Sequence, residues 1–503
     1  MKRKLDHSGK GSNVDGALER AKLADVRYQL PYMSQSALSE LCKWSRDHNG
    51  LPELYSRSTI QRARDEYIDI NTPYGKLVQE CELPYKDGGF MKLEMLNPLA
   101  AIYHTLSSSS SIGQVYAKLL ETKPQPWHLI VYNDEITPGN QLAHKHSRKT
   151  QAIYFSFLEL GPLLAGEQMW WTATLASSKE VSELRGGMSR VIGTFIRQFW
   201  TDKFDITTGG LSIPLAAGKR IQFMAEYGVS LSDELALHMQ FMSKGSSGLK
   251  CCIFCSNCYD AKTTRSSVRS SPWARVHTCP DIKQFVPNTS QTITAIVTAL
   301  RAAASRSKKE LEELQTTYGF TYDADTILFD DFLRAKICPS IHALYDWMHV
   351  LFVTGVFNHT FGKTMSALRK TRVTYEAVHD FLQRWTWPHA LAGATGVETC
   401  ALDRKKINLE GELHKCTASE GLSLIQVLGH FFREALVANA DASESSKAYG
   451  RVMVLLAAIV FELESATVFC CDSGRLEGLI SAFLQSYVRF RCSLYITPLK
   501  RRS

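Results

Sequence analysis

Hydrophobic and polar positions form different patterns in the first and second halves of the chain. Three segments rich in aromatic and β-branched residues, 127–134, 152–160 and 169–176, are separated by polar or Gly/Pro turns, as is typical of strands. Helical spacing then covers 188–200, and strand character returns over 219–229. This order predicts an antiparallel meander of three strands, followed by a helix that crosses to a fourth strand.

Helical spacing prevails in the second half of the chain. Apolar residues recur there at steps of three and four positions, which predicts amphipathic helices. The segments that show this pattern are 294–315, 374–385, 421–440 and 449–465. We therefore expect a large helical C-terminal part behind an α/β core.

Near the N-terminus, 34–48 and 58–67 predict two short helices with a tight connection between them. Such a pair resembles a helix-turn-helix, whose second helix would present Arg62 and Arg64 to a DNA groove. An ordinary helical hairpin explains the same pattern.

The chain as a whole divides into five expected regions. They are a mobile basic arm (1–17), a small helical region with the candidate helix-turn-helix (18–95), the first part of the α/β core (96–250), a cysteine-bearing helical insertion (251–335) and a helical region (336–503).

Composition excludes some classes of protein. The longest apolar run, at 452–464, is too short to span a bilayer, and the basic N-terminus lacks the apolar core of a signal peptide. We therefore expect an intracellular protein that does not enter a membrane. The net charge of +8 over 503 residues is modest and is compatible with a polyanionic partner without requiring one.

Two acidic positions sit next to predicted elements of the core. Asp134 closes the apolar run 127–134, where a carboxylate is costly unless a cation compensates it. A polar turn that opens with Asp134 or Glu135 is the alternative. Asp233 precedes a helical segment, and N-capping alone explains an aspartate there.

Two further acidic positions belong to the helical part. Asp346 and His349 are three residues apart, so on a helix they would share a face and reach one site. Glu420 falls in the first turn of an apolar helix, where it complements the helix dipole.

Several cysteines cluster in one segment, whereas the cysteines of a disulfide framework are distributed along the chain. The chain has 13, of which four lie between 251 and 258. Cys252 and Cys255 form a Cys-x-x-Cys knuckle, and His277 with Cys279 follows after about twenty residues. These four side chains make a workable structural zinc set, with buried free cysteines as the alternative.

The loop between the two ligand pairs is basic. Its side chains could contact phosphates, or the loop could simply be solvated. The residues concerned are Lys262, Arg265, Arg269 and Arg275.

Taken in order, these motifs resemble the RNase H-like transposases of cut-and-paste DNA elements, specifically the CACTA, KDZ and Plavaka group. The resemblance runs from about Trp127 to Glu420 and rests on four features. They are a strand with "YNDE", an aspartate before a helix that leads to "KGSSGLKCCIFC", then "YDWMH", and "TASE" at the start of a helix.

The resemblance implies an RNase H-like mixed sheet with a zinc-knuckle insertion. It implies that Asp134 and Asp233 are the first two catalytic acids, that Asp346-x-x-His349 is the signature pair, and that Glu420 is the final acid. Glu226 competes with Asp233 for the second position, and Glu462 and Glu464 compete with Glu420.

The implied activity is phosphodiester hydrolysis followed by strand transfer, with two Mg²⁺ or Mn²⁺ ions held by the acids. The implied partners are DNA, as transposon ends, and further copies of the chain if it is active, in the nucleus. A catalytically inactive, transposon-derived DNA-binding or regulatory protein with a zinc site is the alternative. A helical scaffold with a zinc knuckle is a third hypothesis, and it predicts that Asp134, Asp233 and Asp346 do not meet.

Overall fold

The structure is a computed structural model that divides the chain into two compact units, Met1–Asp69 and Ile70–Ser503. It describes residues 41, 45, 68–137, 149–201, 203–215, 218–259, 274–275, 281–369, 371, 373–387, 407–408, 413–465 and 472–499. The expected N-terminal arm, and the second helix of the candidate helix-turn-helix with Arg62 and Arg64, lie outside these residues.

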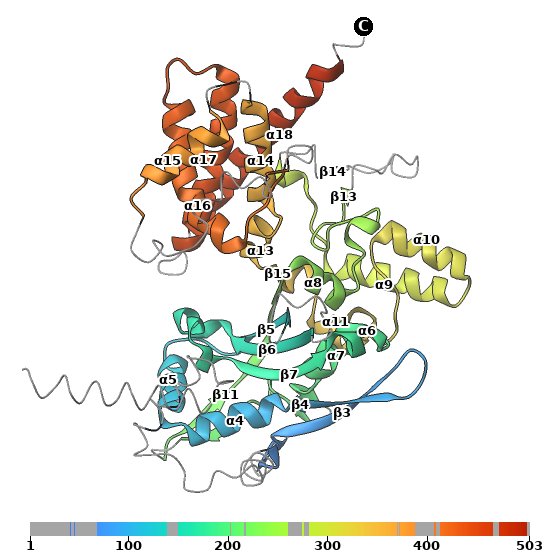
Figure 1. Cartoon of the computed structure of the whole chain (residues 1–503). Helices are drawn as coiled ribbons and strands as arrows, with labels where there is room; N and C mark the ends of the chain where they lie inside the picture. The colour runs from blue at the N-terminus through green and yellow to red at the C-terminus, as the bar shows by residue number, and fades with distance from the viewer. Residues whose placement is uncertain are drawn as a thin grey trace, which may run out of the picture. The chain divides into compact units, whose positions relative to one another are not determined.

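A five-stranded mixed sheet forms the centre of the second unit (Figure 1). Its order is β15-β12-β5-β6-β7. Strands β5, β6 and β7 pair antiparallel, whereas β12 and β15 run parallel to β5 on its other side. The strands are β5 (Trp127–Ile136), β6 (Thr150–Phe157), β7 (Trp171–Ser177), β12 (Ala225–Ser232) and β15 (Ala343–Tyr345).

The predicted meander and the helix after it are confirmed, with shifted ends. β5 continues two residues beyond Asp134, which pairs with Ala152 inside the ladder, so the prediction that the strand ends at Asp134 is wrong. The helix predicted over 188–200 is α7 (Gly187–Arg197). The strand predicted over 219–229 is in fact two strands, β11 (Arg220–Phe223) in a hairpin and β12 in the sheet.

The region expected to be helical over 18–95 contains strands from residue 71 onward. The hairpin of β3 (Val78–Pro84) and β4 (Phe90–Leu96) is the long pair of blue strands in Figure 1. Met91, Leu93 and Met95 are buried and alternate with exposed residues along β4. This period of two is the strand signal that contradicts the helical prediction.

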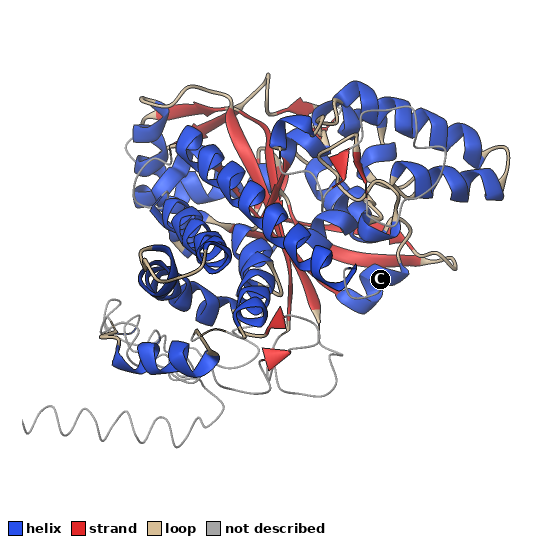
Figure 2. Cartoon of the chain, turned by 90° about the horizontal axis from the view of Figure 1, so that it is seen from above, coloured by secondary structure: helices blue, strands red, loops and turns tan. Residues whose placement is uncertain are grey.

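Aromatic side chains fill the core under the sheet. Trp127 is fully buried at the start of β5 and lies against Tyr116, Phe157 and Phe223, with ring centroids 5.3–6.3 Å apart. Helices α4 (Pro98–Ser108), α5 (Ser110–Leu120) and α7 contribute buried residues to the same core. The protein is therefore a mixed α/β protein, as expected (Figure 2).

The C-terminal part has its own hydrophobic core, formed by helices. The members are α13 (Trp347–Phe352), α14 (Val356–Leu368), α15 (Tyr375–Arg384), α16 (Ala418–Phe432), α17 (Glu444–Ser465) and α18 (Ser473–Leu499). The helical prediction for 336–503 is thus confirmed over most of its described length. None of the helices in the described part of the chain combines the length and apolar composition that a membrane crossing needs.

The helical pattern predicted over 294–315 is split in two. α9 (Ser290–Ala304) ends before Ser307, which caps α10 (Lys308–Tyr318) by accepting a hydrogen bond from the Glu310 N–H. A capping serine inside a periodic stretch thus divides it into a helical hairpin.

The remaining elements are short. The strands are β1 (Asn71–Thr72), β2 (Gly75–Lys76), β8 (Trp200–Thr201), β9 (Phe204–Asp205), β10 (Leu211–Pro214), β13 (Cys258–Tyr259), β14 (Ala274–Arg275), β16 (Ile407–Asn408) and β17 (Leu413–His414). The α-helices are α6 (Ser178–Glu183), α8 (Glu234–Phe241), α11 (Asp331–Lys336) and α12 (Pro339–His342). The 3₁₀ and π turns are η1 (Leu158–Ala165), η2 (Glu167–Met169), η3 (Gly245–Ser247), η5 (Ile282–Gln284), η6 (Ile327–Phe329) and η7 (Arg433–Val437).

Replacing Trp127 by alanine should destabilise the second unit by about 3–5 kcal/mol, because the change removes a large buried ring and leaves a cavity. Chemical denaturation followed by far-UV circular dichroism measures this loss. The control is Leu175→Ala on β7, where the side chain is 55% exposed and the expected change is within about 0.5 kcal/mol. Equal effects of the two substitutions would contradict the assignment of Trp127 to the core.

Candidate functional site

Three aspartates lie at the carboxyl ends of the three parallel strands. Asp134 is on β5, Asp233 follows β12 directly, and Asp346 follows β15 directly. The register places Leu231 beside Tyr132 and Ser232 beside Tyr345. The Asp346 N–H donates to the Ser232 carbonyl at 2.9 Å, so these strand ends are joined by the backbone itself. In open α/β sheets, ligands bind at this edge of the strands.

Tyr132 lies near all three aspartates. Burial raises the pKa of Tyr132, and the charges of Asp134, Asp346 and Asp233 raise this pKa further. Tyr132 and Asp134 point to the same face of β5, and the hydroxyl donates to Asp134 Oδ2 at 3.3 Å. The three aspartates therefore lie at one edge of the sheet, and their joint binding of a metal ion stays a prediction.

Asp233 caps a helix, as its position in the sequence predicted. Its Oδ1 accepts a hydrogen bond from the Ala236 N–H at 2.6 Å, at the N-terminus of α8. The cap fixes the carboxylate at the end of β12. Asp233 is therefore both the N-cap of α8 and one of the three aspartates at the ends of the parallel strands.

Asp346 and His349 form a pair, but not on one face of a helix as predicted. Asp346 is the N-cap of α13, and its Oδ1 accepts from the Met348 N–H at 2.8 Å. Its Oδ2 lies 2.6 Å from His349 Nδ1. Asp346 therefore orients the imidazole, which leaves Nε2 as the ring nitrogen that can contact a ligand.

The competing acids are placed differently. Glu226 lies at the beginning of β12 and contacts His128 Nε2 at 3.2 Å. It is seven residues from Asp233, about 23 Å along an extended strand. Geometry thus favours Asp233 over Glu226 as the second acid.

The candidates for the final acid have local structural roles. Glu420 forms a capping box with Thr417 at the start of α16, where its Oε2 accepts from the Thr417 N–H at 2.8 Å. Glu462 is buried on α17 and pairs with Arg475 at 2.9 Å. Burial raises the pKa of Glu464. The identity of the final acid stays a prediction.

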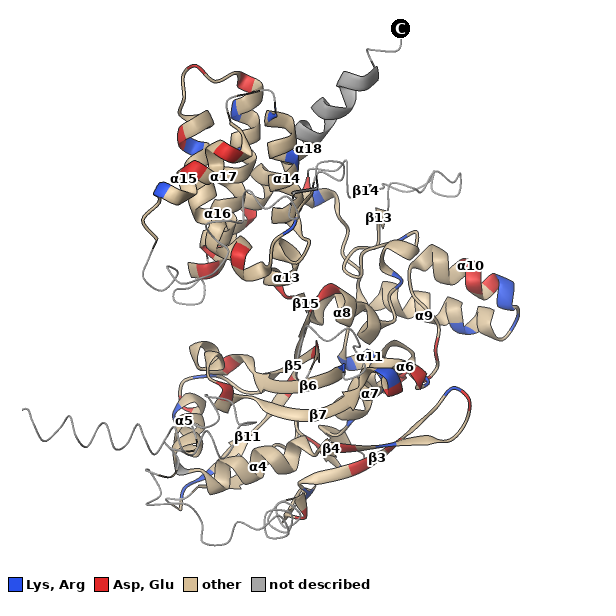
Figure 3. Cartoon of the chain, viewed as in Figure 1, with Lys and Arg blue, Asp and Glu red and all other residues tan. Residues whose placement is uncertain are grey.

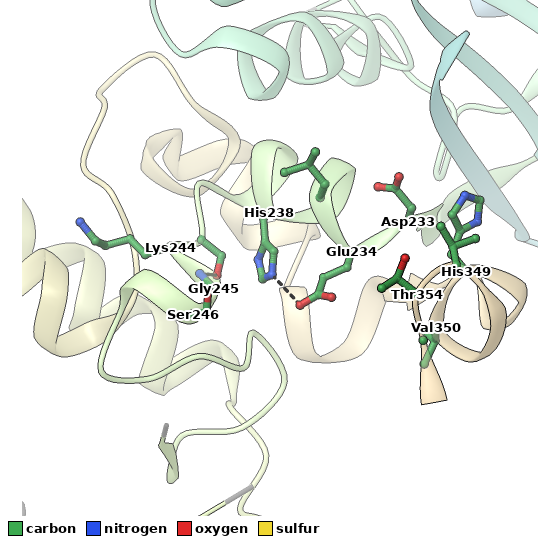
Figure 4. Close-up of a pocket in the computed structure, with 13 residues that line it drawn as sticks. Asp233, Glu234, His238, Lys244, Gly245, Ser246, His349, Val350 and Thr354 are labelled. Atoms are coloured by element: carbon green, nitrogen blue, oxygen red, sulfur yellow. Dashed lines mark hydrogen bonds and ion pairs between the residues drawn. The ribbon is translucent and has the colours of Figure 1, made fainter. Parts of the chain in front are cut away.

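A cavity of about 600 Å³ opens beside the aspartates. It lies between α8, the loop after α8, and the turn that follows α13 (Figure 4). Asp233 and His349 lie at one end, and Lys244 with Gly245 and Ser246 lies at the other (Figure 4). The sequence analysis included Lys244 in the motif "KGSSGLKCCIFC" without assigning it a role, and it did not indicate the turn at Thr354.

The cysteine segment folds into a closed loop. Lys250 and Tyr259 form a β-bridge across its base, Asn288 Nδ2 donates to the Ile253 carbonyl at 3.0 Å, and the Val286 N–H donates to Asn257 Oδ1 at 2.8 Å. These bonds hold the loop against the segment that precedes α9.

The thiols within the loop contact one another. Cys251 Sγ lies 4.0 Å from Cys258 Sγ. Hydrogen bonds from Cys255 and Cys258 lower the pKa of Cys252. His277 and Cys279 lie outside the described residues. Within the described ranges, no three His, Cys, Asp or Glu side chains are arranged as a preformed metal site.

Most of the predicted phosphate-binding residues cannot be placed. Lys262, Arg265 and Arg269 lie outside the described residues, and only the backbone of Arg275, in β14, is described. Over the described residues, basic and acidic side chains are interspersed (Figure 3). DNA binding through the basic loop therefore stays a prediction.

Comparison with known proteins identifies no relative, since neither a family model nor a curated protein sequence matches the chain.

Ser232→Ala should lower the free energy of unfolding by about 1–3 kcal/mol, because it removes a buried hydroxyl that joins two strand ends. Ser232 is fully buried, its Oγ donates to the Asn133 carbonyl at 3.0 Å, and it accepts from the Asn133 N–H at 3.3 Å. Urea denaturation measures the loss. Ser182→Ala, at an exposed hydroxyl on α6, is the control and should change stability by less than about 0.5 kcal/mol. An unchanged Ser232→Ala protein would show that this hydroxyl does not hold the site together.

Proposed function

We propose that the protein is a DNA-cutting and strand-transferring enzyme of the RNase H-like transposase type. The observation that carries the proposal is the placement of Asp134, Asp233 and Asp346 at the carboxyl ends of the parallel strands β5, β12 and β15. Carboxylates at one edge of a sheet can provide oxygen ligands for a divalent cation.

The sheet supports the proposal independently of the acids. A meander of three antiparallel strands, with two further strands parallel to the first on its other side, is the arrangement expected of an RNase H-like sheet. In that arrangement the first strand carries an aspartate near its end, at the edge of a cleft, and β5 with Asp134 holds this position.

The donor set fits a hard divalent cation. Asp134 and Asp233 offer carboxylate oxygens, which Mg²⁺ and Mn²⁺ prefer, and the charged groups that raise the pKa of Tyr132 are all carboxylates. When bound, such ions would activate the attacking oxygen and stabilise the leaving one.

The chain's own residues position the reacting groups. Asp346 uses both of its oxygens on α13, on the Met348 N–H and on His349, so its role is to orient His349. The imidazole lines the cavity beside Asp233, where Nε2 can contact a phosphate oxygen or exchange a proton with it.

The helix caps favour a second function, that of a DNA-binding regulator without catalysis. Asp233 and Asp346 each cap a helix, and such a role would retain both aspartates without any chemistry. DNA binding without cleavage is the behaviour that this alternative predicts.

Asp134→Asn and Asp233→Asn should each reduce Mg²⁺- or Mn²⁺-dependent nicking of plasmid DNA by at least about a hundredfold, because each removes a carboxylate that would hold the catalytic ions. Binding to the same DNA should remain within a few fold of the unsubstituted protein. Removal of divalent ions with EDTA should abolish nicking. Gel assays of supercoiled plasmid measure all three.

The matched control is Glu226→Gln, which neutralises a carboxylate at the other end of β12 and should leave nicking unchanged. Nicking by Asp134→Asn at the original rate would exclude the proposed site. Binding without nicking by the unsubstituted protein would favour the regulator.

We also propose a structural zinc ion at the cysteine loop, with Cys252 and Cys255 as ligands and His277 and Cys279 completing the set. The loop supports this because it is closed by a β-bridge and brings its thiols together.

The purified protein should contain about one zinc ion per chain, and Cys252→Ser and Cys255→Ser should each remove most of it. Mass spectrometry of the metal content measures this. Cys81→Ser, at a cysteine on β3, is the control and should retain zinc. If both loop variants retained zinc, Cys252 and Cys255 would be ruled out as ligands. If zinc were lost in Cys258→Ser but not in Cys279→Ser, the cysteines of the loop alone would form the ligand set.

A further inference from the structure

We propose that the cavity beside Asp233 and His349 binds a single unpaired nucleotide of the DNA substrate. The inference rests on the proposed function and extends it, because it specifies a strand with a nucleotide outside the duplex. The base would lie against an aliphatic wall, and its phosphate would face Lys244.

The size and position of the cavity favour one nucleotide. Its volume of about 600 Å³ lies within the range of small-ligand sites and cannot admit a duplex. Asp233 and His349 belong to its lining, so a nucleotide inside it would be next to the aspartates that the proposed reaction uses. Protein pockets can hold a nucleotide that has left the stack, as enzymes that do chemistry on a base show.

Part of the lining is aliphatic and unusually exposed. Leu235 is 67% exposed, Val353 is 50% exposed and Val350 is 41% exposed, although all three are large hydrophobic residues that line one cavity. Aliphatic surface left in contact with water is stabilised when a flat apolar ligand covers it. A nucleobase is such a ligand, and its binding by apolar contact does not depend on sequence.

The other end of the cavity offers positive charge and a polar loop. Lys244, Gly245 and Ser246 form it (Figure 4). Between the two ends, Glu234 pairs with His238 at 3.3 Å, and this contact lowers the pKa of Glu234. Lys244 carries a positive charge at its own end of the lining, so it can attract a phosphate there.

The turn that closes the cavity has a strained backbone. Thr354 is a β-branched residue at φ 55°, a conformation that such side chains rarely adopt. A Cβ on the adjacent Gly355 would lie 2.1 Å from the Val350 carbonyl oxygen, so only glycine fits there. Strain of this kind concentrates at ligand-binding sites, and here it fixes Val350, Val353 and Thr354 around the cavity.

The test compares two DNA duplexes of the same sequence, one blunt and one with a short 3′ single-stranded tail. Fluorescence anisotropy with the full chain, at one salt concentration and in EDTA, gives the two affinities without cleavage. We expect the tailed duplex to bind about five- to tenfold more tightly than the blunt one. The double variant Val350→Ser/Val353→Ser should lose this difference while retaining its affinity for blunt DNA.

The matched control is Ile341→Ser, which removes an aliphatic side chain that is 66% exposed on α12 and should keep the preference for the tail. Equal affinity of the unsubstituted protein for both duplexes would overturn the inference, and so would a preference that survives in the double variant. In either case, metal-dependent nicking of plasmid would show that the proposed function still holds. Absence of both DNA binding and nicking would overturn the inference and the proposed function together.

Discussion

Parallel pairing of β5, β12 and β15 is the constraint on which the site depends. Side-by-side parallel strands bring their carboxyl ends to one edge, so residues more than two hundred positions apart in sequence meet there. The pairing also concentrates negative charge, because each of the three strands carries or precedes an aspartate. Backbone hydrogen bonds, above all that from Asp346 to Ser232, hold these strand ends together.

The same residues serve stability and the proposed chemistry. Asp233 and Asp346 satisfy N–H groups at the starts of α8 and α13, so each carboxylate is held by a cap before any ligand binds. Preorganisation of this kind lowers the cost of arranging charged groups during a reaction. His349 gains its orientation from Asp346 in the same way.

The sequence predicted the strands of the meander because aromatic and β-branched residues mark them strongly. It missed the β3–β4 hairpin, although Met91, Leu93 and Met95 alternate with polar residues, and it merged β11 with β12 across Met224. β15 has only three residues, too few to show a period. The aspartates were found through motifs, whereas the cavity was not, because Lys244 and Thr354 come from separate loops that only tertiary structure brings together.

The position of β15 far along the sequence affects how the sheet forms during synthesis of the protein. About 110 residues separate it from β12, its only partner in the sheet. Until the ribosome has produced that stretch, one side of β12 has unpaired backbone groups, and unpaired strand edges promote aggregation. Pairing of β15 with β12 joins residues that are far apart in sequence, and contacts of this kind slow folding. Completion of the sheet and placement of the third aspartate are therefore the same late event, and a nascent chain brings Asp346 to the other strand ends only when this edge of β12 is covered.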